Sequence, residues 1–314
     1  MGRQDKILIT GGAGLVGQNL VIRLKQRGFT KLIAIDKHRA NTSTLRRLHP
    51  DITVIEADLA GRGGWEDSLT GTSAVVLNQA QIGGLSYSDF ERNNITATHR
   101  VLDAIQRQPH APHVILVSSS VVNSRAMDLY ADTKRAQERL VLTSGLPCTV
   151  LRPTLMFGWF DRKHLGWLAR FMRKVPIFPV PGRGEYDRQP LYVGDFCNVI
   201  IACLDGKFSG STFNISGLEK ISYIDMIRQV REMVGSRTIV IGIPFSMFWW
   251  LLRIYAVFDS NPPFTTHQLE ALVIPESFPV IDWPRIFGIA ATPFRTALEQ
   301  TFQDPMYSNV VLRF

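Results

Sequence analysis

Long apolar runs and cysteine are scarce in this 314-residue sequence. Its most apolar stretch, residues 243–258, is shorter than the roughly 20 apolar residues that a membrane-spanning helix needs, and Arg253 interrupts it. The three cysteines, Cys148, Cys197 and Cys203, are scattered and form no metal-binding spacing. We therefore expect no transmembrane helix, no metal site, and buried, reduced thiols in a cytoplasmic protein.

Further absences disfavour other classes of protein. Residues 3–6 precede the first predicted strand without an apolar stretch or a cleavage site, so we expect no signal peptide. The sequence has no internal repeat, zinc finger, RNA-recognition signature or long basic run, so we do not expect a nucleic-acid partner. The net charge of +8 still suits an anionic partner, such as a nucleotide diphosphate or a membrane surface.

The aromatic-rich residues 243–258 have two interpretations. On a basic protein, a helix of this composition can lie in a membrane interface, which predicts a peripheral contact at the inner face of the membrane. A helix packed inside the protein or at a subunit contact is the other interpretation, because aromatic stripes usually belong to a core. The sequence leaves both open.

The sequence does contain a glycine-rich turn between a predicted strand, residues 7–9, and a predicted helix. The spacing of the glycines allows a tight turn, a close approach of the backbone to a pyrophosphate, and close packing of the helix on the strand. The start of the helix offers unpaired N–H groups and the positive end of its dipole. The residues predicted to hold the phosphates of a dinucleotide are Gly11, Gly14, Leu15, Val16 and Gly17.

A second predicted strand, residues 32–35, ends at Asp36, about 20 residues after the glycines, where a carboxylate can bind a ribose diol. Asp36 favours NAD, because the 2′-phosphate of NADP would meet like charge. Lys37 and Arg39 follow directly and could accommodate that phosphate, so NADP stays open as an alternative.

Strands and helices alternate through the first half of the chain, which predicts a parallel sheet covered on both faces. The strand at residues 53–55 leads to Asp58 and Leu59, which we predict to contact the adenine. An N-cap role of Asp58 for the following short helix is an equal and compatible interpretation. Further strands are predicted at residues 74–77, 114–117, 148–151 and 212–215, and helices at 42–48, 90–106 and 129–142.

The regular alternation stops after residue 154, where proline and glycine become frequent and short helices and loops follow. We therefore predict an α/β fold, a doubly wound parallel Rossmann sheet with a smaller, mostly helical C-terminal substrate lobe. The Rossmann domain covers residues 1–165, with 187–215 returning to it, and the lobe covers 166–186 and 216–314.

Serines at residues 118–120 end the fifth predicted strand, and Tyr130 and Lys134 open the next helix. Residues four apart lie on one face of a helix, so the lysine ammonium can lie beside the phenol and also reach a ribose. A close cation together with a nicotinamide ring can lower the pKa of a tyrosine from about 10 towards neutrality. We predict that Tyr130 is an acid or base at a sugar hydroxyl, with a strand-end serine hydrogen-bonded to the same oxygen.

On these motifs the chain resembles an extended short-chain dehydrogenase/reductase of the NAD-dependent epimerase/dehydratase group, which acts on nucleotide sugars. The resemblance covers most of the length. The segments that carry it are TGGAGLVG at 10–17, Asp36, Asp58-Leu59, NITAT at 94–98, SSS at 118–120, YADTK at 130–134, RPTLMFG at 152–158 and RQPLYVGD at 188–195.

The resemblance implies roles for individual residues. Tyr130 would transfer the proton and Lys134 would bind the nicotinamide ribose, with Pro153 beside the cofactor. Ser120 matches the catalytic serine best, and Ser119 is the alternative. Two further matches concern the substrate side of the site: Asn94, which would support the fourth helix and the active site, and Arg188, which would bind the diphosphate of the sugar nucleotide.

The sequence also departs from the family pattern. The segment between Ser120 and Tyr130 is short and lacks the usual Val-Tyr-Gly after the serines. Gln79 stands where the family usually has a small alanine, and Ala97 where it usually has glycine. The short segment concerns the geometry of the substrate more than that of the cofactor.

The resulting hypothesis is an NAD-dependent 4-epimerase for a nucleotide-linked hexose or N-acetylhexosamine. A 4-keto-sugar reductase using NADH or NADPH is the alternative enzyme. The C-terminal part also resembles relatives acting on polyprenyl-diphosphate-linked sugars, so a lipid-linked substrate stays open. A non-catalytic NAD-binding subunit is the hypothesis from a different class, and the family implies a homodimer.

Overall fold

The computed structural model describes residues 2–84, 86–124, 128–258, 269 and 280–313. Its centre is a parallel sheet of seven strands in the spatial order β11-β6-β5-β4-β1-β2-β3. These strands are β1 (Lys6–Thr10), β2 (Leu32–Asp36), β3 (Thr53–Glu56), β4 (Thr72–Leu77), β5 (His113–Val117), β6 (Cys148–Pro153) and β11 (Thr212–Ile215).

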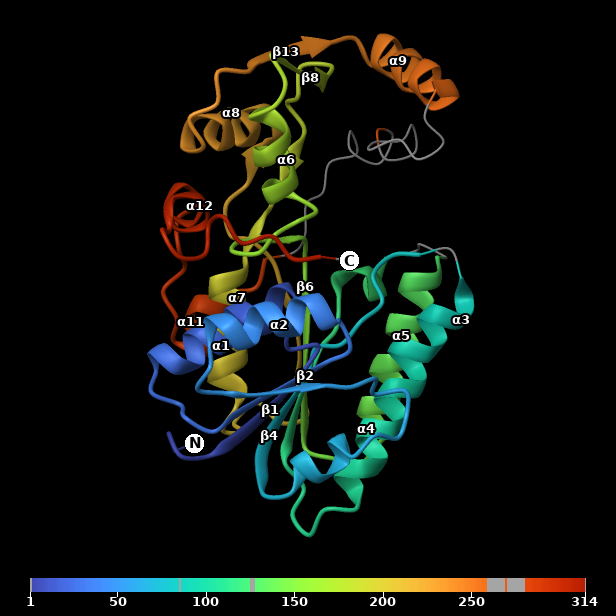
Figure 1. The fold of residues 1–314 in the computed structure, drawn as a ribbon. Coiled ribbons are helices and arrows are strands. Elements are labelled where there is room, and N and C mark those ends of the chain that lie inside the picture. The colour runs from blue at the N-terminus through green and yellow to red at the C-terminus, as the bar shows by residue number, and fades with distance from the viewer. Residues whose placement is uncertain (1, 85, 125–127, 259–268, 270–279, 314) are drawn as a thin grey trace.

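Helices cover both faces of this sheet (Figure 1). On one face lie α1 (Leu15–Gln26), α7 (Val193–Cys203) and α11 (Trp283–Phe287), and on the other lie α4 (Ala97–Gln106) and α5 (Leu129–Leu142). Side chains alternate along β1, so Ile7 and Ile9 pack in the core on the α1 side, whereas Leu8 packs in the core on the α4 side. The predicted doubly wound Rossmann fold is therefore confirmed.

The order of the strands fixes where a ligand can bind. From β1 the chain moves through β2 to β3 in one direction, and β4 then pairs with β1 on its other side. The connections after β1 and β4 consequently diverge, which leaves a crevice at the carboxyl ends of these strands.

The helix predicted at residues 90–106 is divided in the structure. A short helix, α3 (Tyr87–Phe90), is followed by a π-helical turn, η2 (Glu91–Thr96), and then by α4. The sequence pattern reveals no such turn, because its apolar positions continue at helical spacing. In this wide turn the side chain of Asn94 is fully buried.

Beyond the sheet lies a second group of elements: α6 (Leu165–Met172), β8 (Ile177–Pro181), α8 (Tyr223–Met233), β13 (Ile239–Ile243), α9 (Phe245–Phe258) and α12 (Phe294–Gln303). Short strands join them, namely β7 (Met156–Phe157) with β10 (Leu191–Tyr192) and β9 (Asp187–Arg188) with β12 (Ile221–Ser222). The part of the chain after residue 217 thus contains strands as well as helices. None of the described helices is both long and apolar enough to cross a bilayer.

Candidate active site

A cavity of about 510 Å³ opens at the carboxyl ends of β1 and β4, in the crevice that the strand order creates. This volume lies within the range of small-molecule and cofactor sites. The predicted site residues that line it are Gly11, Gly14, Leu15, Val16, Asp36, Asp58, Leu59, Ser119, Ser120, Tyr130, Lys134 and Pro153. Gly17, Asn94 and Arg188 lie outside its wall.

The glycine turn has the geometry of a phosphate cradle. Gly11 has a φ of +60°, and a Cβ there would lie 2.9 Å from the carbonyl carbon of Asn78. A Cβ on Gly17 would lie 2.5 Å from the Cα of Gly12, so α1 packs directly on the turn. Gly14 is the N-cap of α1 and provides no side-chain cap. The backbone at the start of α1 therefore faces the cavity, which fits the pyrophosphate of a dinucleotide.

Asp36 connects the glycine turn to the end of β2. Its carboxylate accepts hydrogen bonds from the backbone N–H of Ala13 at 3.1 Å and of His38 at 2.9 Å. Burial raises the pKa of this carboxyl, while the two hydrogen bonds oppose the shift. Each carboxylate oxygen accepts one of these bonds and has further acceptor capacity, and Asp36 lines the cavity, so it can accept from a ribose diol.

Asp58 is held in a turn after β3. Its Oδ1 accepts from the backbone N–H of Ala60 at 2.9 Å, and its Oδ2 pairs with Arg92 at 2.7 Å. The following short helix, η1 (Trp65–Leu69), has Gly64 as its N-cap, so the N-cap interpretation of Asp58 is wrong. The same residue and Leu59 also line the cavity. An adenine placed there would contact a carboxylate that is already held in position.

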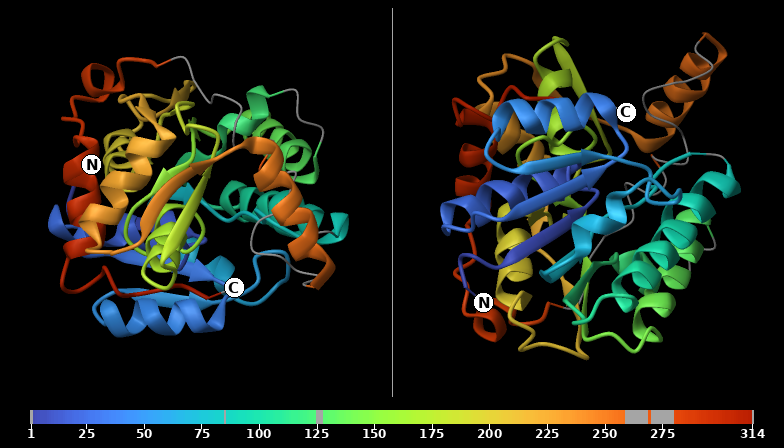
Figure 2. Two further views of the ribbon diagram at one scale, coloured as in Figure 1. Left: turned by 90° about the horizontal axis from the view of Figure 1, so that it is seen from above. Right: turned by 60° about the horizontal axis from the view of Figure 1, so that its bottom comes forward.

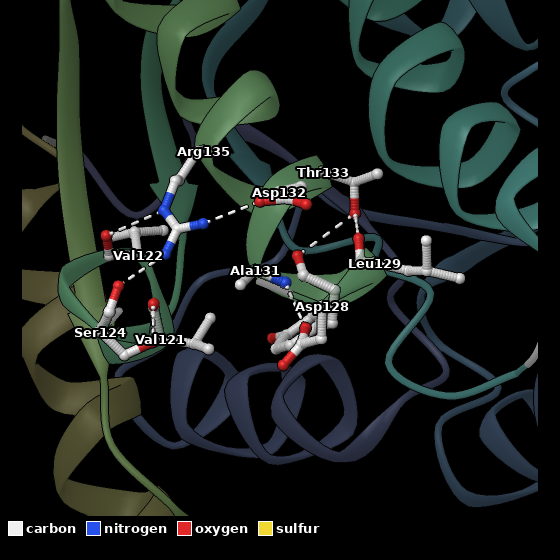
Figure 3. A network of polar contacts seen from close by, with 10 residues as sticks. Val121, Val122, Ser124, Asp128, Leu129, Ala131, Asp132, Thr133 and Arg135 are labelled. Atoms are coloured by element: carbon white, nitrogen blue, oxygen red, sulfur yellow. Dashed lines mark hydrogen bonds and ion pairs between the residues drawn. The ribbon is translucent and has the colours of Figure 1, made fainter. Parts of the chain in front are cut away.

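The segment after the serines is fixed to the start of α5 by Arg135 (Figure 3). The guanidinium donates to the carbonyl oxygens of Val122 and Ser124 at 3.3 and 2.6 Å and pairs with Asp132 at 2.8 Å. Asp128 caps the helix by accepting from the N–H of Ala131 at 2.8 Å. The 3₁₀ turn η3 (Ser120–Asn123) is thereby held beside the first turn of α5.

Tyr130 and Ser119 meet in this arrangement. A side-chain hydrogen bond joins them, and both line the cavity together with Ser120. Burial raises the pKa of Tyr130, which the hydrogen bond with Ser119 partly offsets. This direction is opposite to the lowering expected from a neighbouring cation, because burial is the largest effect on the phenol. The ammonium of Lys134 donates to other groups.

Lys134 is fully buried, and its Nζ donates to the carbonyl oxygen of Val117 at 2.9 Å and to Oε1 of Gln137 at 2.5 Å. Burial lowers the pKa of this ammonium to about 7, against the opposing charge of Glu138. A lysine with such a pKa changes its charge readily near neutral pH.

A chain of buried amides and hydroxyls connects Lys134 to the glycine turn, and sequence reasoning missed it. Gln137 donates to Thr98 Oγ1 at 2.8 Å, and Gln79 donates to the same oxygen at 3.1 Å. Gln79 in turn accepts from Thr10, whose hydroxyl also accepts from the N–H of Asn78. The unusual glutamine at position 79 therefore joins β1, α4 and α5. Its only sequence signal was the departure from the family pattern.

A second buried network lies one turn further along α5, at Glu138. Glu138 accepts from Ser118 Oγ at 2.7 Å and, through both carboxylate oxygens, from Nε and Nη2 of Arg152. Because the hydroxyl of Ser118 donates its hydrogen bond to Glu138, the serine that can donate to a ligand in the cavity is Ser119 or Ser120.

The two residues predicted for the substrate side lie outside the cavity wall in this structure. Asn94 is fully buried, and its carboxamide accepts from the N–H of Gln81 at 2.6 Å and donates to Thr133 at 3.0 Å, so it supports the wall of the site, the role that the resemblance implies. Arg188 lies over the rings of Tyr186 and Tyr223, with its guanidinium carbon 4.9 and 6.0 Å from their centroids. In this arrangement its guanidinium is not directed into the cavity.

The wall also contains Lys163 and His164, which sequence reasoning missed. The buried carboxylate of Asp161 accepts from the backbone N–H groups of both and of Gly166 at 2.9 to 3.0 Å. The charged run at residues 161–164, directly after an apolar segment, was the available signal. Among the described residues, no cluster of three or more His, Cys, Asp or Glu side chains could hold a metal ion.

Known proteins are similar to this chain over most of its length. A 3 beta-hydroxysteroid dehydrogenase/Delta 5-->4-isomerase of Mycobacterium tuberculosis is 27% identical over 86% of this chain and 80% of its own length. A UDP-N-acetyl-alpha-D-glucosaminuronate decarboxylase of Bacillus cytotoxicus is 25% identical over 77% of this chain and 84% of its own.

Among solved structures, a UDP-glucuronic acid 4-epimerase of Bacillus cereus in complex with NAD has the same fold. Its TM-score is 0.72 at 20% identity, with 96% of this chain and 98% of that chain covered. Residues 7–216, well over half of the chain, match the model of a single family. The protein is therefore an enzyme of the NAD dependent epimerase/dehydratase family, as the sequence predicted, and its cofactor is NAD.

Proposed function

We propose that this enzyme is an NAD-dependent sugar 4-epimerase that acts on a nucleotide-linked hexose or N-acetylhexosamine through a 4-keto intermediate. The observation that supports it best is that Tyr130, its hydrogen-bond partner Ser119 and Lys134 line the same cavity as the glycine turn and Asp36. In this family, bound NAD supplies a reversible hydride acceptor.

The side chains that line the cavity would transfer the proton and hold the sugar and the cofactor. Tyr130 takes the proton of the C4 hydroxyl and returns it, and Ser119 or Ser120 hydrogen-bonds to the same oxygen. Lys134 would leave its Gln137 partner for the ribose hydroxyls, which brings its charge to the phenol and lowers the pKa of Tyr130.

The division of the chain belongs to the same proposal. A Rossmann domain of residues 1–165 and 187–215 would hold NAD, and a lobe of residues 166–186 and 216–314 would cover the sugar. Lys163 and His164, at the boundary between them, line the cavity and can contact an anionic substrate. A homodimer is a further prediction from the family.

One incubation tests the reaction type. The purified protein is mixed with UDP-N-acetylglucosamine, or with UDP-glucose, without added nicotinamide, and the sugars are followed by NMR. An epimerase interconverts the C4 epimers with the cofactor that it carries. The amount of bound NAD is verified after denaturation of the protein. If NAD is bound and neither UDP-sugar is interconverted, the proposal is rejected for these two substrates.

A reductase is the second candidate, because the Mycobacterium tuberculosis relative is by its name a dehydrogenase, a class that produces net oxidation or reduction. Such an enzyme would consume NADH or NADPH in proportion to a keto substrate and would leave a UDP-hexose unchanged without added cofactor. The incubation therefore separates the two candidates.

A further inference from the structure

The end of the molecule farthest from the central sheet is formed by β8, β13 and α9 (Figure 1). The strands β8 and β13 pair in parallel, and α9 follows β13 directly. Figure 2 shows α9 at the edge of the molecule in both views. We call this surface, residues 173–183 and 236–254, the lobe tip.

The helix α9 presents an apolar stripe to solvent. Met247, Trp250, Leu251 and Ile254 lie at positions i, i+3, i+4 and i+7, and they are 46%, 62%, 52% and 55% exposed. This spacing places them on one face of the helix. A stripe of this kind normally faces a core, and here it faces outward.

The strand pair continues the apolar surface. Along β8 and β13 alternate residues point inward, and Phe178 and Val180 are buried in the core. The paired residues Ile177 and Ile239, and also Ile241, point to the opposite side and are exposed. The lobe tip therefore combines two adjoining elements that each expose large apolar side chains.

The two chain segments that form this surface carry charge of one sign. Residues 162–183 and 234–258 contain arginine and lysine but no aspartate or glutamate. Five of these basic residues are exposed: Arg173, Lys174, Arg183, Arg237 and Arg253. Within the described residues, no acidic side chain forms an ion pair with any of the five.

We propose that the lobe tip binds the surface of an anionic phospholipid bilayer. The apolar stripe would enter the boundary between head groups and acyl chains, where tryptophan is favoured, and the basic residues would contact the anionic head groups. A second copy of the chain is a poorer occupant, because a symmetric contact would bring two sets of these basic residues together. The inference does not depend on which sugar the enzyme converts.

Vesicle flotation with the full chain tests the proposal. We expect binding to vesicles of phosphatidylcholine and phosphatidylglycerol, with weaker binding at high salt and little binding to phosphatidylcholine alone. The double variant Arg173→Gln with Lys174→Gln should bind about 30-fold more weakly, because each basic residue near an anionic surface contributes a factor of about five. The variant Trp250→Ser with Leu251→Ser should lose binding even at low salt.

Matched controls lie on other surfaces. Ile286→Ser changes an exposed apolar residue outside the lobe tip. Arg46→Gln with Arg47→Gln removes two charges from α2 (Arg39–Leu48). Both control variants should bind the vesicles as the wild type does. Circular dichroism and thermal unfolding establish that each variant is folded. Equal binding by the folded lobe-tip variants, or no binding of the wild type to anionic vesicles, would overturn the proposal. Concentration-dependent dimerisation lost in Trp250→Ser with Leu251→Ser would identify a second copy as the occupant instead.

Discussion

The buried ammonium of Lys134 makes the stability of the cofactor-free protein depend on pH in a definite direction. Burial lowers its pKa from 10.5 to about 7, so between these values the unfolded chain binds more protons than the folded protein. The free energy of unfolding then rises with pH through this window. From pH 7 to pH 9 the contribution of Lys134 amounts to about 2 kcal/mol.

The variant Lys134→Met removes this contribution. It leaves the Val117 carbonyl and the Gln137 side chain without their donor, but that cost is nearly independent of pH and cancels when two pH values are compared. We therefore expect the gain in unfolding free energy from pH 7 to pH 9 to be about 2 kcal/mol smaller in Lys134→Met than in the wild type.

The assay is urea denaturation of the NAD-stripped proteins at pH 7 and pH 9, in one buffer system at constant ionic strength. Lys31→Met, a change of an exposed lysine, is the matched control and should keep the pH dependence of the wild type. Equal pH dependence in wild type and Lys134→Met would refute the reasoning, because it would mean that Lys134 is not held in a desolvated site.

Three further variants test other parts of the site. Gly17→Ala places a Cβ 2.5 Å from the Cα of Gly12, so it should lower the unfolding free energy by about 2 kcal/mol. It should also weaken NAD binding, measured by protein fluorescence. Unchanged NAD binding would contradict the assignment of the glycine turn as the phosphate site. Asp36→Ala should weaken NAD binding about tenfold and NADP binding less. An equal loss of affinity for the two cofactors would contradict a contact between Asp36 and the ribose. Glu138→Gln breaks the buried pair with Arg152 and should cost about 3 kcal/mol in urea denaturation, whereas a loss below 1 kcal/mol would show that the pair is dispensable.

Much of the fold was predictable because its signals are local. The strand at residues 212–215 and the helix at 129–142 have the predicted bounds. β1 is one residue longer than predicted at each end, and β2 is one residue longer at its C-terminal end. Apolar runs, the glycine turn and Asp36 follow one another within a short stretch, and each restricts the backbone where it stands. Alternation of strands and helices then leaves few arrangements other than a parallel sheet.

The details of the site depend on contacts between distant residues, which the pattern does not encode. Residues 118–120 are identical, and only the contacts of Ser118 with Glu138 and of Ser119 with Tyr130 distinguish them. The direction of the Lys134 side chain likewise depends on Gln137, one turn further along α5. The expectation of a lowered pKa for Tyr130 applies to a phenol beside both the lysine ammonium and the nicotinamide ring, whereas burial alone raises this pKa.

The same limit applies to the two residues predicted for the substrate side. A family motif gives the position of Asn94 but not the π-helical turn that buries it. It gives the position of Arg188 but not the aromatic rings of Tyr186 and Tyr223 that the guanidinium contacts.

The central claim, that the phenol of Tyr130 exchanges the sugar proton in the NAD cavity, is tested most directly by the turnover of Tyr130→Phe. With NAD content equal to that of the wild type, the account predicts a loss of turnover of at least 100-fold, the usual effect of removing a general acid or base. Tyr87→Phe, which changes an exposed tyrosine outside the cavity, should turn over as the wild type does. Turnover by Tyr130→Phe within a few-fold of the wild type would contradict the account.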